Sequence, residues 1–224
     1  MISVLTQRAL KYATMNVVRY RKAVLGKRLP EPCLWYFAYG ANLNSKRFEK
    51  YGMNVVHIGN AKLEGHALRF TLPCEYRGKG FASVEPEPGK NVWGVVYKID
   101  RLSLFLLDIM EWALLNQYRR IRVKVKKKGG QELEAFCYRA RYPKEGLVPS
   151  TEYKKLVLKS AREHQFPTDY LSGIEAHPSQ DKFDLDSGFS LLMPPVRRPF
   201  EGILKKPYLW HDRIRERLCE KLRF

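Results

Sequence analysis

The stretch WYFAYGANL, residues 35–43, decides the fold of this chain. Its first five residues are aromatic or apolar, which is typical of a buried β-strand. Gly40, Ala41 and Asn42 then interrupt the strand, because glycine has no side chain and asparagine tolerates a positive φ better than most residues. Asn44-Ser45 can cap a short helix that runs to about Lys50. The pattern therefore predicts a strand, a tight loop and a helix in succession.

The loop at 40–42 allows two interpretations. Its backbone amides have no strand partner, so they can point toward an anion such as a carboxylate or a phosphate. The same residues are also typical of an ordinary corner between a strand and a helix. Spacing alone favours the corner, and both interpretations stay open at this point.

Composition limits the class of protein. A chain of 224 residues, 45% of them hydrophobic, can bury one sizeable core. No apolar run reaches the length of a transmembrane helix. The four cysteines are widely spread, with no CxxC pair and no histidine at zinc spacing. This argues against a metal site or a disulfide framework and suits a reducing compartment.

The positive charge is concentrated at the two ends of the chain. The formal net charge is +18, residues 1–30 contain seven Lys or Arg and no acid, and residues 194–224 contain nine against four acids. The N-terminal segment is loosely helical and rich in arginine, like a mitochondrial presequence, although a basic arm that docks on a partner fits equally. We therefore expect a mitochondrial location, with a cytoplasmic one as the alternative. Strong positive charge is an argument about partners rather than about fold.

Further along, strands and helices do not alternate regularly. Periodicity and turn residues predict four strands, at 55–61, 67–72, 81–84 and 92–99, and a hairpin of 118–125 and 133–140. They also predict a helix over 102–110 that is capped by Asp100, helices at 153–164 and 167–171, and a basic helix over 208–222. Pro86, Pro88 and Gly89 predict a turn between the third and fourth strands. Helices gathered late in the chain indicate an α+β fold.

Proline and composition divide the chain into three parts. Residues 29–32, Leu-Pro-Glu-Pro, end the first basic segment. We predict a basic N-terminal extension or presequence over 1–32, a folded domain over 33–176 and a basic C-terminal extension over 177–224.

Four motifs, in the same order, resemble those of the γ-glutamylcyclotransferase family. Residues 36–43 resemble its signature YFAYGSNL, residues 92–98 its VWGVV strand, residues 107–111 its LDxxE helix end, and residues 149–155 its PSxxYKK helix start. The similar stretch covers about residues 34–176. The resemblance implies an α+β fold with a mixed, barrel-like sheet and flanking helices.

The resemblance also implies a reaction. The α-amine of a γ-glutamyl amide attacks its own γ-carbonyl, and 5-oxoproline leaves together with an amine or an amino acid, without a cofactor or a metal. Because the ring closure is intramolecular, the enzyme has to fix the reactive rotamer and move protons. One carboxylate can act as general base and then as general acid, and the motif assigns that role to Glu111. Its apolar neighbours, Met110 and Trp112, predict a raised carboxyl pKa through partial burial.

The substrate-binding residues follow from the same motifs. The backbone amides of Gly40, Ala41 and Asn42 are expected to bind the substrate. The side chains expected to line the pocket are tyrosines, which can donate a hydrogen bond while their rings exclude water: Tyr36, Tyr39, Tyr118 and Tyr153. Each tyrosine can equally be a packed aromatic residue, and this alternative is favoured for Tyr39.

Two positions depart from the family pattern. Ala41 replaces the usual serine, and Trp112 stands where a glycine commonly follows the catalytic glutamate. Together with the basic ends they support a second hypothesis, a weakly active or inactive member that serves as a basic subunit of a large RNA-containing assembly in mitochondria. Residues 1–30 and 194–224 would then contact RNA or a ribonucleoprotein. Glu111, Tyr118 and Tyr153 favour the enzyme.

Overall fold

The computed structural model describes residues 33–51, 53–73 and 79–180, together with positions 9, 12, 13 and 16. The chain divides into two units, residues 1–183 and 184–224, and all described residues belong to the first. Most of the extension expected over 1–32, most of that over 177–224 and the terminal helix expected over 208–222 lie outside the described residues. The three domain boundaries, the RNA contact and the mitochondrial location therefore stay predictions.

Five strands form a closed barrel. They are β1 (Leu34–Ala38), β2 (Val55–Pro73), β3 (Gly80–Ile99), β4 (Tyr118–Lys127) and β5 (Glu132–Ala140), in the order β1-β3-β2-β4-β5. Neighbouring strands run antiparallel, except that β1 and β5 close the barrel in parallel through Tyr36 and Phe136. The expected barrel-like sheet is confirmed, as is the hairpin of β4 and β5.

Two strands are longer than the sequence predicts. The expected strands over 55–61 and 67–72 are one strand, β2, and those over 81–84 and 92–99 are one strand, β3. The turn predicted at Pro86, Pro88 and Gly89 is therefore wrong. β2 and β3 pair along their length, and shifts in register, the first between His57 and Gly59, bend the strands without ending them. Proline and glycine in a strand often mark such irregularities.

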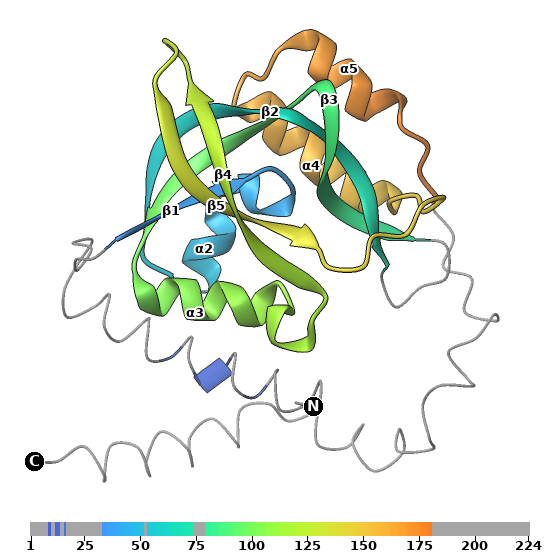
Figure 1. Ribbon diagram of the computed structural model, residues 1–224. Helices are drawn as coiled ribbons and strands as arrows, with labels where there is room; N and C mark the ends of the chain where they lie inside the picture. The colour runs from blue at the N-terminus through green and yellow to red at the C-terminus, as the bar shows by residue number, and fades with distance from the viewer. Residues whose placement is uncertain are drawn as a thin grey trace, which may run out of the picture. The chain divides into compact units, whose positions relative to one another are not determined.

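Short helices cover the barrel. They are η1 (Ala41–Leu43), α2 (Lys46–Lys50), α3 (Arg101–Met110), η2 (Ala113–Leu115), α4 (Thr151–Glu163) and α5 (Thr168–Ala176). Asp100 caps α3 as expected, since its side chain accepts a 2.7 Å hydrogen bond from the backbone N–H of Ser103. Figure 1 shows α4 and α5 together on one side of the barrel and α3 on the opposite side. The α+β fold class is confirmed, and no described helix is long and apolar enough to span a membrane.

Alternate residues of β1 pack in two different apolar layers. Phe37 joins a buried cluster built from all five strands, which fills the barrel. Tyr36 and Ala38 join a second cluster that also contains buried residues of the helices, such as Phe48 of α2 and Leu107 of α3. The period of two in a strand explains this division. As a result β1 is fixed on both faces, and the loop that follows it is held between the barrel and the helices.

Candidate functional site

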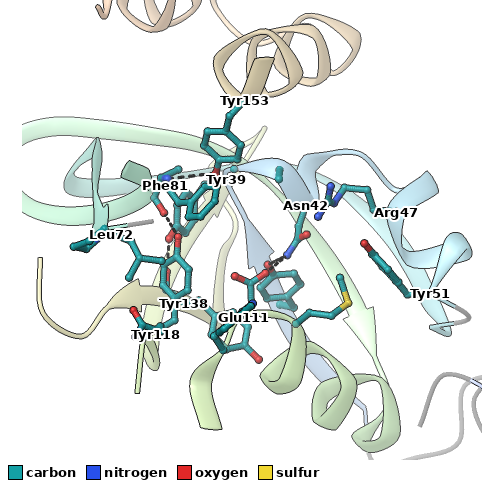
Figure 2. Close-up of a pocket in the computed structure, with 18 residues that line it drawn as sticks. Tyr39, Asn42, Arg47, Tyr51, Leu72, Phe81, Glu111, Tyr118, Tyr138 and Tyr153 are labelled. Carbon is teal, nitrogen blue, oxygen red and sulfur yellow. Dashed lines mark hydrogen bonds between the residues drawn. The ribbon is translucent and has the colours of Figure 1, made fainter. Parts of the chain in front are cut away.

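A cavity of about 670 Å³ opens beside the loop that follows β1. Its volume lies within the range of about 300–1,000 Å³ that is usual for small-molecule sites. All eight residues predicted from the sequence as site residues lie on its wall: Tyr36, Tyr39, Gly40, Ala41, Asn42, Glu111, Tyr118 and Tyr153. Figure 2 shows Glu111 in the middle, with most of the tyrosines on one side and Asn42, Arg47 and Tyr51 on the other. The fold thus brings these residues from four separate parts of the chain to one cavity.

The loop requires glycine at position 40 because other residues approach it closely. A Cβ atom on Gly40 would lie 3.2 Å from the hydroxyl oxygen of Tyr153 and 3.3 Å from the Cβ of Ala82. The φ of Gly40 is −117°, so space rather than a left-handed backbone requires glycine here. The segment that follows the loop is also fixed, because the carbonyl of Leu43 accepts a 3.0 Å hydrogen bond from the hydroxyl of Tyr97.

Glu111 follows the last residue of α3, and its side chain is half-buried. The side-chain amide of Asn42 donates to Oε1 of Glu111 at 2.6 Å and to the hydroxyl oxygen of Tyr36 at 2.9 Å. These two bonds use both hydrogens of the amide. The bond to Glu111 is the stronger kind, because its acceptor is a charged carboxylate. Asn42 is itself buried. Its side chain therefore positions Glu111, a role that the sequence analysis did not assign, since it considered only the backbone of this residue.

Five tyrosines of the cavity are neutral at physiological pH. Burial raises the pKa of Tyr36, Tyr39, Tyr118 and Tyr138 well above the ordinary value, and it raises the pKa of Tyr153 to about 12. The negative charge of Glu111 adds to the rise in the pKa of all five. These phenols consequently keep their protons and can act as hydrogen-bond donors.

Three of these hydroxyl groups donate to the protein itself. Tyr39 donates to the backbone carbonyl of Tyr138, Tyr118 donates to the carbonyl of Ala82 at 2.5 Å, and Tyr138 donates to Oδ1 of Asp108 at 2.7 Å. In these contacts the three tyrosines brace the wall of the cavity. For Tyr39 this matches the packed role that the sequence analysis favoured.

The hydroxyls of Tyr36 and Tyr153 are used differently. The oxygen of Tyr36 accepts from Asn42, and the oxygen of Tyr153 accepts a 3.3 Å hydrogen bond from the backbone N–H of Ala82. Within residues 33–51, 53–73 and 79–180, neither hydroxyl has an acceptor for its own proton. Both protons can therefore be donated to a ligand.

Trp112 adopts a backbone conformation that usually belongs to glycine. Its φ is +54° and its ψ is +28°, in the left-handed region. This geometry explains why a glycine is common at the position, since a side chain there costs about 1–2 kcal/mol. The half-buried Trp112 lines the cavity but does not fill it, because the cavity keeps a volume of about 670 Å³.

We expect Trp112→Gly to be more stable than Trp112→Ala by about 1 kcal/mol. Both variants lose the indole ring, so the pair isolates the cost of the left-handed backbone. In an ordinary helical position alanine is the more stable of the two. Chemical denaturation of both variants measures the difference, and an alanine variant as stable as the glycine variant would contradict this backbone conformation.

Several cavity residues were missed by sequence reasoning. They are Arg47, Tyr51, Leu72, Pro73, Phe81, Ala82, Met110, Gln117 and Tyr138, with Trp112 noted only as a departure. Arg47 offered one signal, because a cation in the first turn of a helix opposes the helix dipole and so needs another reason to be there. Tyr138 offered none, since it fits an ordinary strand.

The arrangement suits proton transfer to and from a small polar substrate. A carboxylate, held by an amide, faces a cavity whose other polar groups include neutral phenols, the guanidinium of Arg47, the amide of Gln117 and the backbone of a tight loop. Among the described residues, no three His, Cys, Asp or Glu side chains come together as a metal site. The groups on the wall of the cavity are therefore acid–base and hydrogen-bonding groups.

Comparison with known proteins gives consistent results. Residues 91–174 match the AIG2-like family. The γ-glutamylcyclotransferase of Bos taurus is 33% identical over 155 residues, which cover 66% of this chain and 81% of the relative. The γ-glutamylcyclotransferase of Homo sapiens is 31% identical over 159 residues, covering 67% and 82% respectively. A solved structure of a γ-glutamyl cyclotransferase is 28% identical, with a TM-score of 0.61 over 78% of this chain and 99% of that one.

Proposed function

Because the chain belongs to the γ-glutamylcyclotransferase family, we propose that it converts a γ-glutamyl amide into 5-oxoproline and releases an amine or an amino acid. One observation carries the proposal: the Glu111 carboxylate faces the cavity beside the loop, held there by Asn42 at 2.6 Å. A carboxylate fixed at a cavity wall is the group that this reaction needs, because protons have to leave one nitrogen and reach another.

The reaction balances with Glu111 as the single proton carrier. The carboxylate takes a proton from the α-ammonium group of the substrate, and the free amine attacks the γ-carbonyl carbon to form the ring C–N bond. The bond between that carbon and the amide nitrogen then breaks as the protonated Glu111 gives its proton to the departing nitrogen. The regenerated carboxylate takes the extra proton from the ring nitrogen and passes it to the departed amine, which leaves as an ammonium ion. No water is consumed. Both reacting groups belong to the same substrate molecule. Holding that molecule in the conformation that brings them together lowers the entropic barrier to ring closure.

The other groups of the cavity would bind and orient the substrate. The backbone amides of Gly40, Ala41 and Asn42 are donors for substrate oxygens, and replacing the usual serine by Ala41 leaves its amide in place. The hydroxyl protons of Tyr36 and Tyr153 are further donors that the described residues leave unused. Tyr39 and Tyr118 would contribute their rings to a wall that excludes water. An open cavity beside Glu111 and Trp112 supports the enzyme over the non-catalytic alternative.

The purified protein is expected to release 5-oxoproline from γ-glutamyl-alanine and to keep its rate when a chelator is present. Chromatography of the reaction mixture against a 5-oxoproline standard measures the product. A matched incubation without protein gives the spontaneous rate, which has to be subtracted. If the protein adds nothing to that rate with either γ-glutamyl-alanine or γ-glutamyl-ethylamide, the proposed function is wrong.

A further inference from the structure

Arg47 carries a buried donor for which the described residues provide no partner. It lies in the first turn of α2, one turn after the loop, and it lines the same cavity as Glu111. Its Nε is buried, and in the part of the chain that the structure describes it has no hydrogen-bond partner. Figure 2 shows its guanidinium pointing inward, toward Asn42. A buried cationic donor is costly unless an acceptor satisfies it, which points to an anion as ligand.

A second donor lies near this arginine. Tyr153 lines the same cavity as Arg47. The Tyr153 oxygen accepts from the N–H of Ala82 at 3.3 Å, which orients the phenol and leaves its proton for a ligand. The ring of Tyr153 is also fixed, by edge-to-face contacts with Phe70 and Phe81 at centroid distances of 6.2 Å and 5.1 Å. A charged donor and a neutral donor thus line the same cavity.

We propose that Arg47 and Tyr153 form a carboxylate-binding subsite of this cavity. The guanidinium supplies charge and planar N–H donors, which suit a carboxylate better than a point charge does. The Tyr153 hydroxyl supplies one further hydrogen bond. Arg47 is in this account a residue that binds substrate and not one that moves a proton. The inference rests on the proposed function, whose substrates carry such a group.

Two carboxylates of a γ-glutamyl compound fit the subsite. One is the α-carboxylate of the glutamyl unit, which every such substrate has. The other belongs to the departing amino acid and is missing when an amine departs. γ-Glutamyl-alanine carries both groups, whereas γ-glutamyl-ethylamide carries only the first. The two compounds therefore tell which carboxylate Arg47 binds.

The test compares the steady-state kinetics of wild type and Arg47→Gln with both compounds. We expect KM for γ-glutamyl-alanine to rise roughly 10- to 100-fold, which is the usual effect of losing a hydrogen bond to a charged group. We expect kcat to change little, because the contact binds substrate and transition state alike. An equal rise in KM for the ethylamide assigns the α-carboxylate, and a rise restricted to the dipeptide assigns the departing amino acid.

Matched variants separate binding from folding. Lys46→Gln removes the same charge from the neighbouring, exposed position of α2, which does not line the cavity, and it is expected to leave both KM values unchanged. Arg47→Lys keeps the charge but loses the planar donors, so an intermediate KM is expected. Unchanged KM values for both compounds in a folded Arg47→Gln variant would overturn the subsite. A fall in kcat at constant KM would overturn it as well, because it would place Arg47 in the chemical step.

Calorimetric titration with the same two compounds covers the case in which no 5-oxoproline forms. Tight binding that weakens roughly 10- to 100-fold in Arg47→Gln would support the subsite even though the proposed reaction fails. Equal binding by wild type and Arg47→Gln would reject the subsite whatever the outcome for the reaction.

Discussion

Glu111→Gln is expected to lower kcat for 5-oxoproline release about a hundredfold or more, the usual loss when a general acid–base group is removed. The amide has nearly the size of the carboxylate, and its oxygen can still accept the hydrogen bond from Asn42. It cannot take a proton from the substrate amine or give one to the departing nitrogen. The initial rate of 5-oxoproline formation with saturating substrate measures the effect.

A suitable control for this variant is Glu49→Gln. Glu49 is an exposed acid of α2 that does not line the cavity. The Glu49→Gln variant should therefore release 5-oxoproline at the same rate as wild type. Thermal melts of both variants show whether the fold is kept. If Glu111→Gln is folded and its rate is within about twofold of wild type, Glu111 does not carry the proton.

Gly94→Ala is expected to lower the free energy of unfolding by about 3 kcal/mol or more, because the added methyl group overpacks the barrel. A Cβ atom on Gly94 would lie 2.4 Å from the backbone oxygen of Ala38 and 2.5 Å from two ring atoms of Phe37. Both neighbours belong to β1, which pairs with β3 at this point. For a domain of this size such a loss corresponds to a fall in Tm of roughly 6–12 °C. Calorimetry or a CD melt measures it.

Gly173→Ala provides the matched comparison. Gly173 lies in α5, and a Cβ atom there would meet no other atom within 4 Å. Alanine is the better helix former, so this variant should gain up to about 1 kcal/mol. A Gly94→Ala variant that melts with wild type would show that β1 and β3 do not approach as closely as the structure has them.

The sequence predicted those parts of the fold that local signals determine. The strand at 35–39 appears as β1, the hairpin around Gly129-Gly130 joins β4 to β5, and Asp100 caps α3. In each case the deciding residues are neighbours along the chain, so periodicity or a turn motif is sufficient. The VWGVV motif places a glycine at position 94, but the sequence around it does not explain why. The reason is a contact with another strand, because Phe37 of β1 leaves no room for a side chain at Gly94.

The parts that were missed depend on contacts between distant residues. Pro86 and Gly89 are typical of a turn, and only the pairing of β3 with β2 shows that they bend one continuous strand. Within the site, only the family motif identifies Glu111, because a glutamate at the end of a helix is otherwise usually a surface residue. Its contact with Asn42 spans 69 positions of the chain, and no spacing rule reaches that far. Arg47 and Tyr138 enter the cavity for the same reason.

Cleavage of γ-glutamyl-alanine in ¹⁸O-enriched water tests the central claim most directly, namely that the cavity beside Glu111 closes a ring within the substrate. Mass spectrometry of the products distinguishes the two ways in which the amide bond can break. Attack by the internal amine predicts 5-oxoproline that contains no oxygen from the solvent, together with alanine. Glutamate that carries one ¹⁸O atom in its γ-carboxyl group would show attack by water and would contradict the account.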